Sequence, residues 1–193
     1  MPVLTPTDFR PFKAFTVTDQ PDENLSLIAI DIGYSSRNRS CGLSWTGCKC
    51  SEELKYGATI DRVSRILAEP AFHKSLLILE APLSKYHDPD TGNPDVRGIF
   101  ENGHGWYYGA GVLTLVAAMR FLEMLAATFN RDREIFLAEA FLSNKDNSTG
   151  HNDDAEIIRK NFWSVEPRQL NSQCENASSF VCGGIPSVRE FKH

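Results

Sequence analysis

The sequence predicts a three-layer α/β fold, in which helices cover both faces of a mixed central sheet. Three almost wholly apolar runs have the length of strands that are buried on both faces. Segments with helical spacing of apolar residues alternate with these runs, and such alternation implies parallel strands with helices on both sides. A turn-forming segment after the first run adds antiparallel strands at the start of the sheet.

The first expected strand, 25–33, is an apolar run that ends at a glycine. Residues 34–39 have the composition of a turn, and 40–46 return as a second strand, so the two form a hairpin. The remaining expected strands are 53–56, 75–80, 135–142 and a short edge strand within 179–182.

Apolar residues from Ile60 to Leu67 recur at helical spacing, which predicts a helix over 58–69 that Pro70 ends. Polar loops rich in glycine and proline are expected at 82–106 and 144–152. Two further helices are expected at 108–130 and 153–162.

Length and composition indicate one globular domain. A chain of 193 residues removes roughly 70% of its unfolded surface from water, which is enough for a core without disulfides. We expect an irregular arm over 1–24 and a single domain over 25–193. The odd number of cysteines, five, and the polar, proline-rich N-terminus predict a reduced, cytoplasmic protein.

The charge of the chain limits its partners. A net charge of −5 argues against a protein that coats nucleic acid or an anionic membrane through bulk charge, although it allows a local basic groove. The most apolar stretch, 112–129, carries Arg120 and Glu123, whereas a membrane span needs about 20 largely apolar residues. We therefore expect a core helix there and no membrane partner.

One carboxylate interrupts each of the three apolar strands near its C-terminal end: Asp31, Glu80 and Glu139. An ionised carboxylate is costly to bury unless it is paired or bound to a metal. The carboxyl ends of parallel strands lie at one edge of a sheet, where open α/β folds bind ligands. For a single acid, a capped turn or a lysine partner is the simpler explanation, but three acids in successive strands favour a site. Oxygen ligands of this kind suit Mg²⁺ or Mn²⁺.

A further candidate element is the segment 150–155, Gly-His-Asn-Asp-Asp-Ala, at the start of an expected helix. His151 and Asp154 are three residues apart and share a face once the helix has begun. An alternative is a purely structural role, because Asn152 or Asp153 is a natural N-cap and acids suit a helix N-terminus.

These residues resemble three motifs of the ribonuclease H-like nucleases. Residues 28–33 look like the first motif, an apolar strand that ends in Asp-x-Gly before a hairpin. Residues 77–80 look like the second, a Glu at the end of the first strand after a helix. Residues 151–155 are similar to the His-x-x-Asp-Ala of the third RuvC motif, at the head of a late helix.

Within that superfamily, two more segments resemble a family of uncharacterised predicted nucleases. One is Glu80 followed by Ala-Pro-Leu, and the other is Glu139 followed by Ala-Phe. The resemblance spans about 27–163. It implies a ribonuclease H-like fold, with a mixed sheet whose first strands are antiparallel and with helices on both faces.

The resemblance also implies an enzyme that hydrolyses phosphodiester bonds in DNA or RNA with two Mg²⁺ or Mn²⁺ ions. Asp31 would bridge both ions, while Glu80 and Asp154 would each hold one. His151 would orient or deprotonate the attacking water.

Two acids have less defined roles in this interpretation. Asp153 would support the ligands or replace one of them, and Glu139 would be either a further ligand or a structural acid. The loop cations that would neutralise phosphate charge are Arg37, Arg39, Lys85 and Arg97, each of which is also explained as a solvated loop charge.

Two other functions fit the sequence. One is a catalytically degenerate binding or scaffold domain on the same fold, because fold does not fix function. The other is a nucleotide-dependent phosphotransferase, because Asp31 and Gly33 followed by two serines look like the first phosphate loop of sugar kinases and actin-like ATPases. The second of these requires two such half-domains, for which 193 residues are too few.

Overall fold

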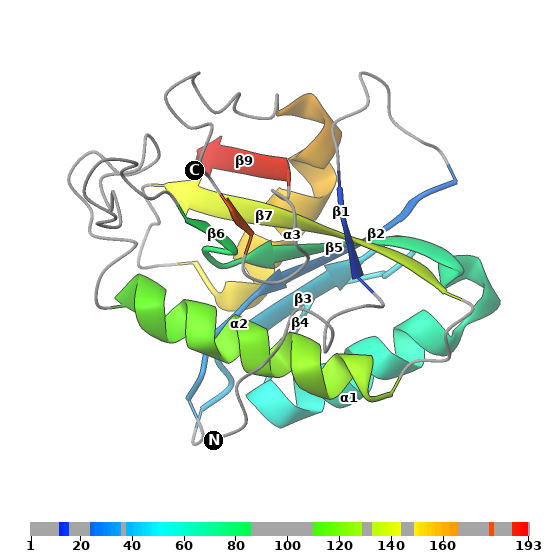
Figure 1. The fold of residues 1–193 in the computed structure, drawn as a ribbon, viewed down its shortest axis with the longest axis horizontal. Helices are drawn as coiled ribbons and strands as arrows, with labels where there is room; N and C mark the ends of the chain where they lie inside the picture. The colour runs from blue at the N-terminus through cyan, green and yellow to red at the C-terminus, as the bar shows by residue number, and fades with distance from the viewer. Residues whose placement is uncertain are drawn as a thin grey trace.

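The architecture is α/β, with a seven-stranded mixed sheet and helices on both of its faces (Figure 1). It is taken from a computed structural model, which describes residues 12–15, 24–35, 38–85, 110–128, 133–143, 149–165, 178–179 and 187–192. The strands of the sheet are β1 (Phe12–Ala14), β2 (Ser26–Asp31), β3 (Cys41–Trp45), β4 (Glu52–Leu54), β5 (Lys74–Glu80), β7 (Glu134–Ser143) and β9 (Ser187–Lys192). A separate pair is formed by β6 (Ser84–Lys85) and β8 (Ser178–Ser179), which run antiparallel.

The sheet has an antiparallel and a parallel half. β2, β3 and β4 are joined in antiparallel order, as the predicted hairpin requires. β5 pairs parallel with β2, and β7 pairs parallel with β5. The far edge of β7 is shared, because β1 pairs with its first part and β9 with its second part, both in parallel. The carboxyl ends of β2, β5 and β7 therefore lie at one end of the sheet.

Among the described residues, two α-helices cover one face of this sheet and a third covers the other (Figure 1). The helices are α1 (Tyr56–Ala68), α2 (Ala110–Ala126) and α3 (His151–Asn161). Residues of α1 and α2 pack with the side chains of Ile28, Ile30 and Leu79 in one buried cluster. Ile158 of α3 packs with Ala29 and Ile78 in a second buried cluster on the opposite face. Alternation along each strand thus divides the core into two.

The predicted strands over 25–33, 75–80 and 135–142 are confirmed as β2, β5 and β7. The predicted helix over 58–69 is confirmed as α1, and α2 lies within the helix predicted over 108–130. None of the helices in the described part of the chain combines the length and apolar character needed to cross a membrane.

The expectation of an irregular arm over 1–24 is wrong for Phe12–Ala14, which form β1. Phe12 is buried against the core of the domain, and the ring centroids of Phe15 and Trp163 lie 5.9 Å apart. Three residues are too few to show a strand pattern, so local sequence gave no signal for this pairing. The rest of the segment 1–24, apart from Phe15 and Asn24, lies outside the described residues.

Other differences concern the loops and the C-terminal part. The loop predicted over 82–106 contains β6, and its residues from 86 onward lie outside the described part. The helix predicted over 153–162 begins earlier, at His151. The edge strand predicted within 179–182 is observed only at Ser178–Ser179, and the remaining positions lie outside the described residues.

β9 was not predicted because a charged residue, Arg189, occupies its middle. The Arg189 side chain is buried, and its guanidinium lies 4.0 Å from the centre of the Phe162 ring. It donates hydrogen bonds to the carbonyls of Phe162 and Val165, the latter at 2.7 Å, just beyond the end of α3. Burial lowers the pKa of Arg189 to about 10. The arginine therefore fastens the C-terminal end of α3 to the sheet.

Candidate metal centre

Asp31 and Glu80 are the last residues of β2 and β5, and they are direct neighbours in the register of these parallel strands. Adjacent strands are about 4.8 Å apart, so the two side chains start from neighbouring positions at this end of the sheet. Both point to the face that α3 covers, since Ala29 and Ile78, two residues earlier on each strand, belong to the core cluster under α3. Both side chains are buried.

The N-terminus of α3 brings two more functional side chains to Asp31. The Nδ1 atom of His151 lies 2.7 Å from Oδ2 of Asp31. Asp154, one turn further along α3, is also buried, with 3% of its surface exposed. Asp31, His151 and Asp154 each offer a ligand atom, and these atoms all lie within 4.8 Å of one another. The predicted shared face of His151 and Asp154 is thus observed, and it faces the end of β2.

The close approach of α3 depends on a glycine in the neighbouring strand. Gly42 of β3 is the register partner of Asp31. A Cβ atom at Gly42 would lie 1.7 Å from the backbone oxygen of His151, which no side chain can tolerate. Gly33 has a similar role in the hairpin, because its Cβ would lie 1.9 Å from the Ser40 carbonyl oxygen. Only glycine permits such backbone contacts.

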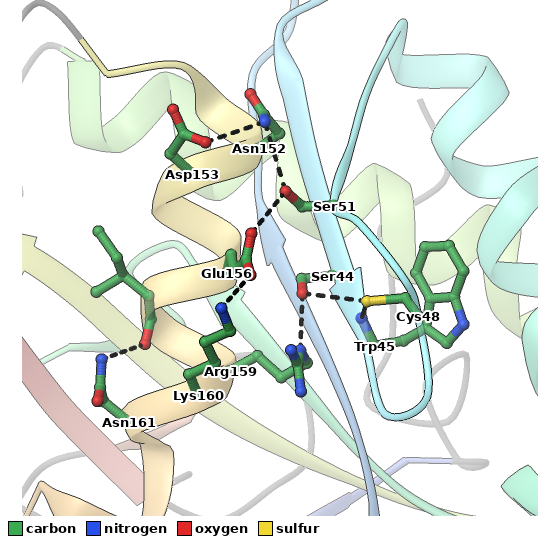
Figure 2. A network of polar contacts seen from close by, with 11 residues as sticks. Ser44, Trp45, Cys48, Ser51, Asn152, Asp153, Glu156, Arg159, Lys160 and Asn161 are labelled. Carbon is green, nitrogen blue, oxygen red and sulfur yellow. Dashed lines mark hydrogen bonds and ion pairs between the residues drawn. The ribbon is translucent and has the colours of Figure 1, made fainter.

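A polar network fixes α3 against β3 and the turn that follows it (Figure 2). Arg159 donates through Nε to the Ser44 hydroxyl at 2.7 Å, and the Ser44 oxygen lies 3.6 Å from the Cys48 sulfur. Ser51 donates to Glu156 at 3.1 Å and accepts from the Asn152 amide at 3.4 Å. These contacts run along α3 and fix its position against β3 and the following turn.

Asp153 lies outside the group of three. It is exposed, and its Oδ2 accepts the backbone N–H of Gly150 at 3.2 Å. Its Oδ1 accepts from the Asn152 side chain at 3.1 Å (Figure 2). The N-cap is Gly150, rather than Asn152 or Asp153 as the sequence suggested, and Asp153 closes the first turn of α3 from inside the helix.

The structure also separates Glu139 from the other acids. Its register partner is Leu79, whose side chain belongs to the core under α1 and α2, so Glu139 points to the opposite face from Asp31 and Glu80. Its Oε2 accepts the backbone N–H of Leu83 at 3.0 Å. Glu139 is buried, and its hydrogen bond to Leu83 fixes the segment that follows β5.

The predicted substrate cations are only partly described. Arg39 is exposed in the turn between β2 and β3. Lys85 belongs to β6, but the structure describes only its backbone. Arg37 and Arg97 lie outside the described residues. The structure therefore brings none of these four into contact with the metal centre within its described residues.

Two residues that support the site, Thr149 and Gly42, belong to no motif that the sequence analysis identified. Thr149 donates through its hydroxyl to Oδ1 of Asp154 at 3.3 Å. Gly42, discussed above, is a glycine inside a predicted strand, and such a glycine often marks a close approach of another backbone. That general signal was present in the sequence, but it does not say which segment approaches.

The chemistry of the site is that of oxygen and imidazole ligands. Cys41 lies on β3 beside Gly42, and its thiol donates to the Gly33 carbonyl at 3.1 Å. Burial raises the pKa of the Cys41 thiol, so the sulfur stays neutral and is a poor ligand. Two carboxylates and one imidazole within 4.8 Å can hold a divalent cation. Comparison with known proteins adds no assignment, because no family model, curated protein or solved structure matches the chain.

Proposed function

We propose that this protein is a metal-dependent nuclease that hydrolyses phosphodiester bonds of DNA or RNA at the site formed by Asp31, His151 and Asp154. The observation that carries the proposal is that ligand atoms of these three residues, from β2 and α3, lie within 4.8 Å of one another. Glu80 stands beside Asp31 on the same face and provides a further carboxylate.

The fold supports the same proposal. The antiparallel order of β2, β3 and β4, the parallel β5 and β7, and helices on both faces are the features expected of a ribonuclease H-like domain. We therefore propose that the domain belongs to that superfamily. The acids at the ends of β2 and β5 and at the head of α3 belong to the three segments that resemble motifs of that superfamily, and this supports the proposal.

The donor set fits Mg²⁺ or Mn²⁺. Asp31, Glu80 and Asp154 supply buried carboxylates, which need a cation or hydrogen-bond donors to offset the cost of desolvation. Asp31, Glu80 and Asp154 would hold the ions. Two bound ions would activate water and stabilise the leaving oxygen of an in-line displacement.

The remaining role belongs to His151. Its Nδ1 lies against Asp31, and this contact fixes the orientation of the imidazole ring. A ring held in this way can orient the attacking water and accept its proton. Thr149, through its hydrogen bond to Asp154, keeps that carboxylate turned toward the site.

The test is a panel of single-stranded and duplex DNA and RNA substrates incubated with Mg²⁺ or Mn²⁺. Cleavage is expected with metal, and Asp31→Asn is expected to abolish it while the circular dichroism spectrum stays that of the wild type. Cleavage in excess chelator, or full cleavage by the Asn variant, would refute the mechanism.

A further inference from the structure

A groove with an apolar floor lies at the same end of the sheet as the metal centre. Its volume is about 710 Å³, which is the size of a pocket for a small organic group. The described residues that line it come from the turn after β2, the first turn of α1 and the outer face of α2: Tyr34, Ser35, Lys55, Tyr56, Gly57, Ala58, Leu113, Val116, Ala117 and Arg120.

The chain connects this groove directly to the proposed site. Tyr34 and Ser35 follow Asp31 after only Ile32 and Gly33. The other wall begins at Lys55, immediately after β4, whose last residue pairs with Cys41 at the start of β3. Gly42, the next residue of β3, is the register partner of Asp31. The groove and the candidate metal centre therefore lie at the same end of β2 but on opposite faces of the sheet, the groove on the side of α1 and α2 and Asp31 on the side of α3.

The groove exposes large apolar side chains to solvent. Tyr34 is 50% exposed, and Leu113 and Val116 are more than half exposed. A folded chain gains by covering such side chains, and exposed contiguous apolar surface commonly marks an interaction site. Tyr34 offers an aromatic face, and Leu113 and Val116 offer an aliphatic surface in the same lining.

The charge of the groove indicates an anionic ligand. Both charged residues among its described lining, Lys55 and Arg120, are basic. Arg120 also makes an exposed ion pair with Glu123, which is not among those lining residues. Lys55 is the N-cap of α1, whose first turn carries no acid. An apolar floor with a basic rim suits a ligand that combines flat rings with phosphates.

We propose that this groove binds unpaired nucleotides of the substrate strand, with a base against Tyr34 and a phosphate near Lys55, while the strand passes over the end of β2 and a further phosphodiester lies at Asp31. The inference rests on the proposed nuclease function and narrows its substrate to nucleic acid with a single-stranded segment. Bases stack on aromatic side chains without sequence preference, and lysines follow the backbone. A duplex hides its base faces and is excluded from such a groove.

The test measures binding in excess chelator, so that no strand is cut. The probes are a fluorescent oligothymidylate, an oligouridylate and a duplex of the same length, followed by fluorescence anisotropy. Tyr34→Ala is expected to weaken binding of both single strands about 5-fold or more, and Tyr34→Phe to restore it. Lys55→Ala is expected to weaken binding and to lower the slope of log K against log salt by about 0.7.

Matched controls lie outside the groove, one on α2 and one shortly before β4. Met124→Ala removes an exposed apolar side chain of α2 that does not line it, for comparison with Leu113→Ala. Lys49→Ala removes an exposed lysine near β4, for comparison with Lys55→Ala. Both controls are expected to bind like the wild type.

Four results would overturn the proposal. The first is wild-type affinity in both Tyr34→Ala and Lys55→Ala. The second is a duplex that binds as tightly as the single strands. The third is a wild type that binds no single strand. The fourth is a dimer that Val116→Asp converts to monomer, which would make the groove a contact between two copies. Failure of the nuclease function is seen separately, as unchanged cleavage in Asp31→Asn.

Discussion

Oδ2 of Asp31 and Nδ1 of His151 lie 2.7 Å apart although the residues are separated by 120 positions in the chain. The contact joins the end of a central strand to the first residue of a helix that packs across it. Such a contact is possible only because α3 approaches β3 at a glycine. The candidate metal centre therefore depends on the end of β2, the start of α3 and the glycine of β3.

Metal binding should stabilise the protein through Asp154 and not through Asp153. Mn²⁺ at about 100 times its Kd raises the free energy of unfolding by about 2.7 kcal/mol. For a domain of this size, that corresponds to an increase in Tm of about 5 to 10 °C. Asp154→Asn should lose most of this increase in differential scanning fluorimetry.

Asp153→Asn is the matched control, because Asp153 belongs to the same turn but faces the Gly150 N–H. It should lower the Tm slightly without metal and keep the increase with metal. Equal losses in the two variants, or no increase in the wild type, would show that the site holds no ion.

His151 should affect the rate of cleavage more than the stability. If its ring orients or deprotonates the water, His151→Gln should lower kcat by about 10²- to 10⁴-fold. Asn152→Ala is the control, because Asn152 is the next residue of α3 but its side chain contacts Ser51 and Asp153. Single-turnover cleavage assays compare the two variants, and an unchanged rate in His151→Gln would remove the histidine from the mechanism.

The sequence predicted much of the fold because its strongest patterns are local. The apolar runs of β2 and β5 are continuous, and each ends in an acid, so their strand assignment and the position of the acids followed from neighbouring residues alone. The shared face of His151 and Asp154 likewise follows from helix geometry. These features required no knowledge of distant contacts.

What local sequence did not supply is the relation between distant segments. Alternation shows which residues of one strand point to the same side. The register between neighbouring strands decides whether residues of two different strands point to the same face of the sheet. Glu139 is paired with Leu79 and therefore points away from Glu80, which neither strand shows by itself. β1 and β9 are short or interrupted by a charge, and their pairing with β7 is a purely tertiary feature.

Gly42→Ala should destabilise the protein and disturb the metal centre together. The added Cβ would collide with the His151 backbone, and overpacking of this kind costs about 1–3 kcal/mol. Urea unfolding should report the loss, and the increase in Tm with Mn²⁺ should shrink because α3 is displaced.

Gly57→Ala is the control for Gly42→Ala, because alanine at this position should not destabilise the protein. No atom lies within 4 Å of a Cβ at Gly57, which is in the first turn of α1. Alanine there should leave the metal response unchanged and stabilise the helix by up to about 1 kcal/mol. If both variants unfold like the wild type, the close approach at Gly42 is not required.

Tyr56 should make stability depend on pH in the alkaline range. Burial raises the pKa of Tyr56 from 10 to about 12, and its hydroxyl donates to the Ala117 carbonyl at 2.6 Å. Because the folded pKa is the higher one, the folded protein holds this proton more tightly than the unfolded chain. The contribution is complete below pH 10 and is lost as the pH rises through about 12.

Urea unfolding across that range should show the decline in the wild type and a smaller decline in Tyr56→Phe. Tyr34→Phe, which removes an exposed phenol, should decline like the wild type. An ultraviolet titration gives an independent reading, since Tyr56 should ionise only near pH 12 and this ionisation should be missing in Tyr56→Phe. Identical pH profiles in all three proteins would contradict the assignment.

Glu80 and Glu139 should differ in function although both are buried carboxylates at strand ends. Glu80→Gln removes a charge beside Asp31 and should reduce both cleavage and the increase in Tm with Mn²⁺. In Glu139→Gln, the amide oxygen can still accept the Leu83 N–H, so both properties should stay near those of the wild type, with at most about 1 kcal/mol of stability lost. Isothermal titration with Mn²⁺ distinguishes the two variants directly. A loss of metal binding in Glu139→Gln with none in Glu80→Gln would mean that the ligands lie on the α1 and α2 face, and the proposed centre would be in the wrong place.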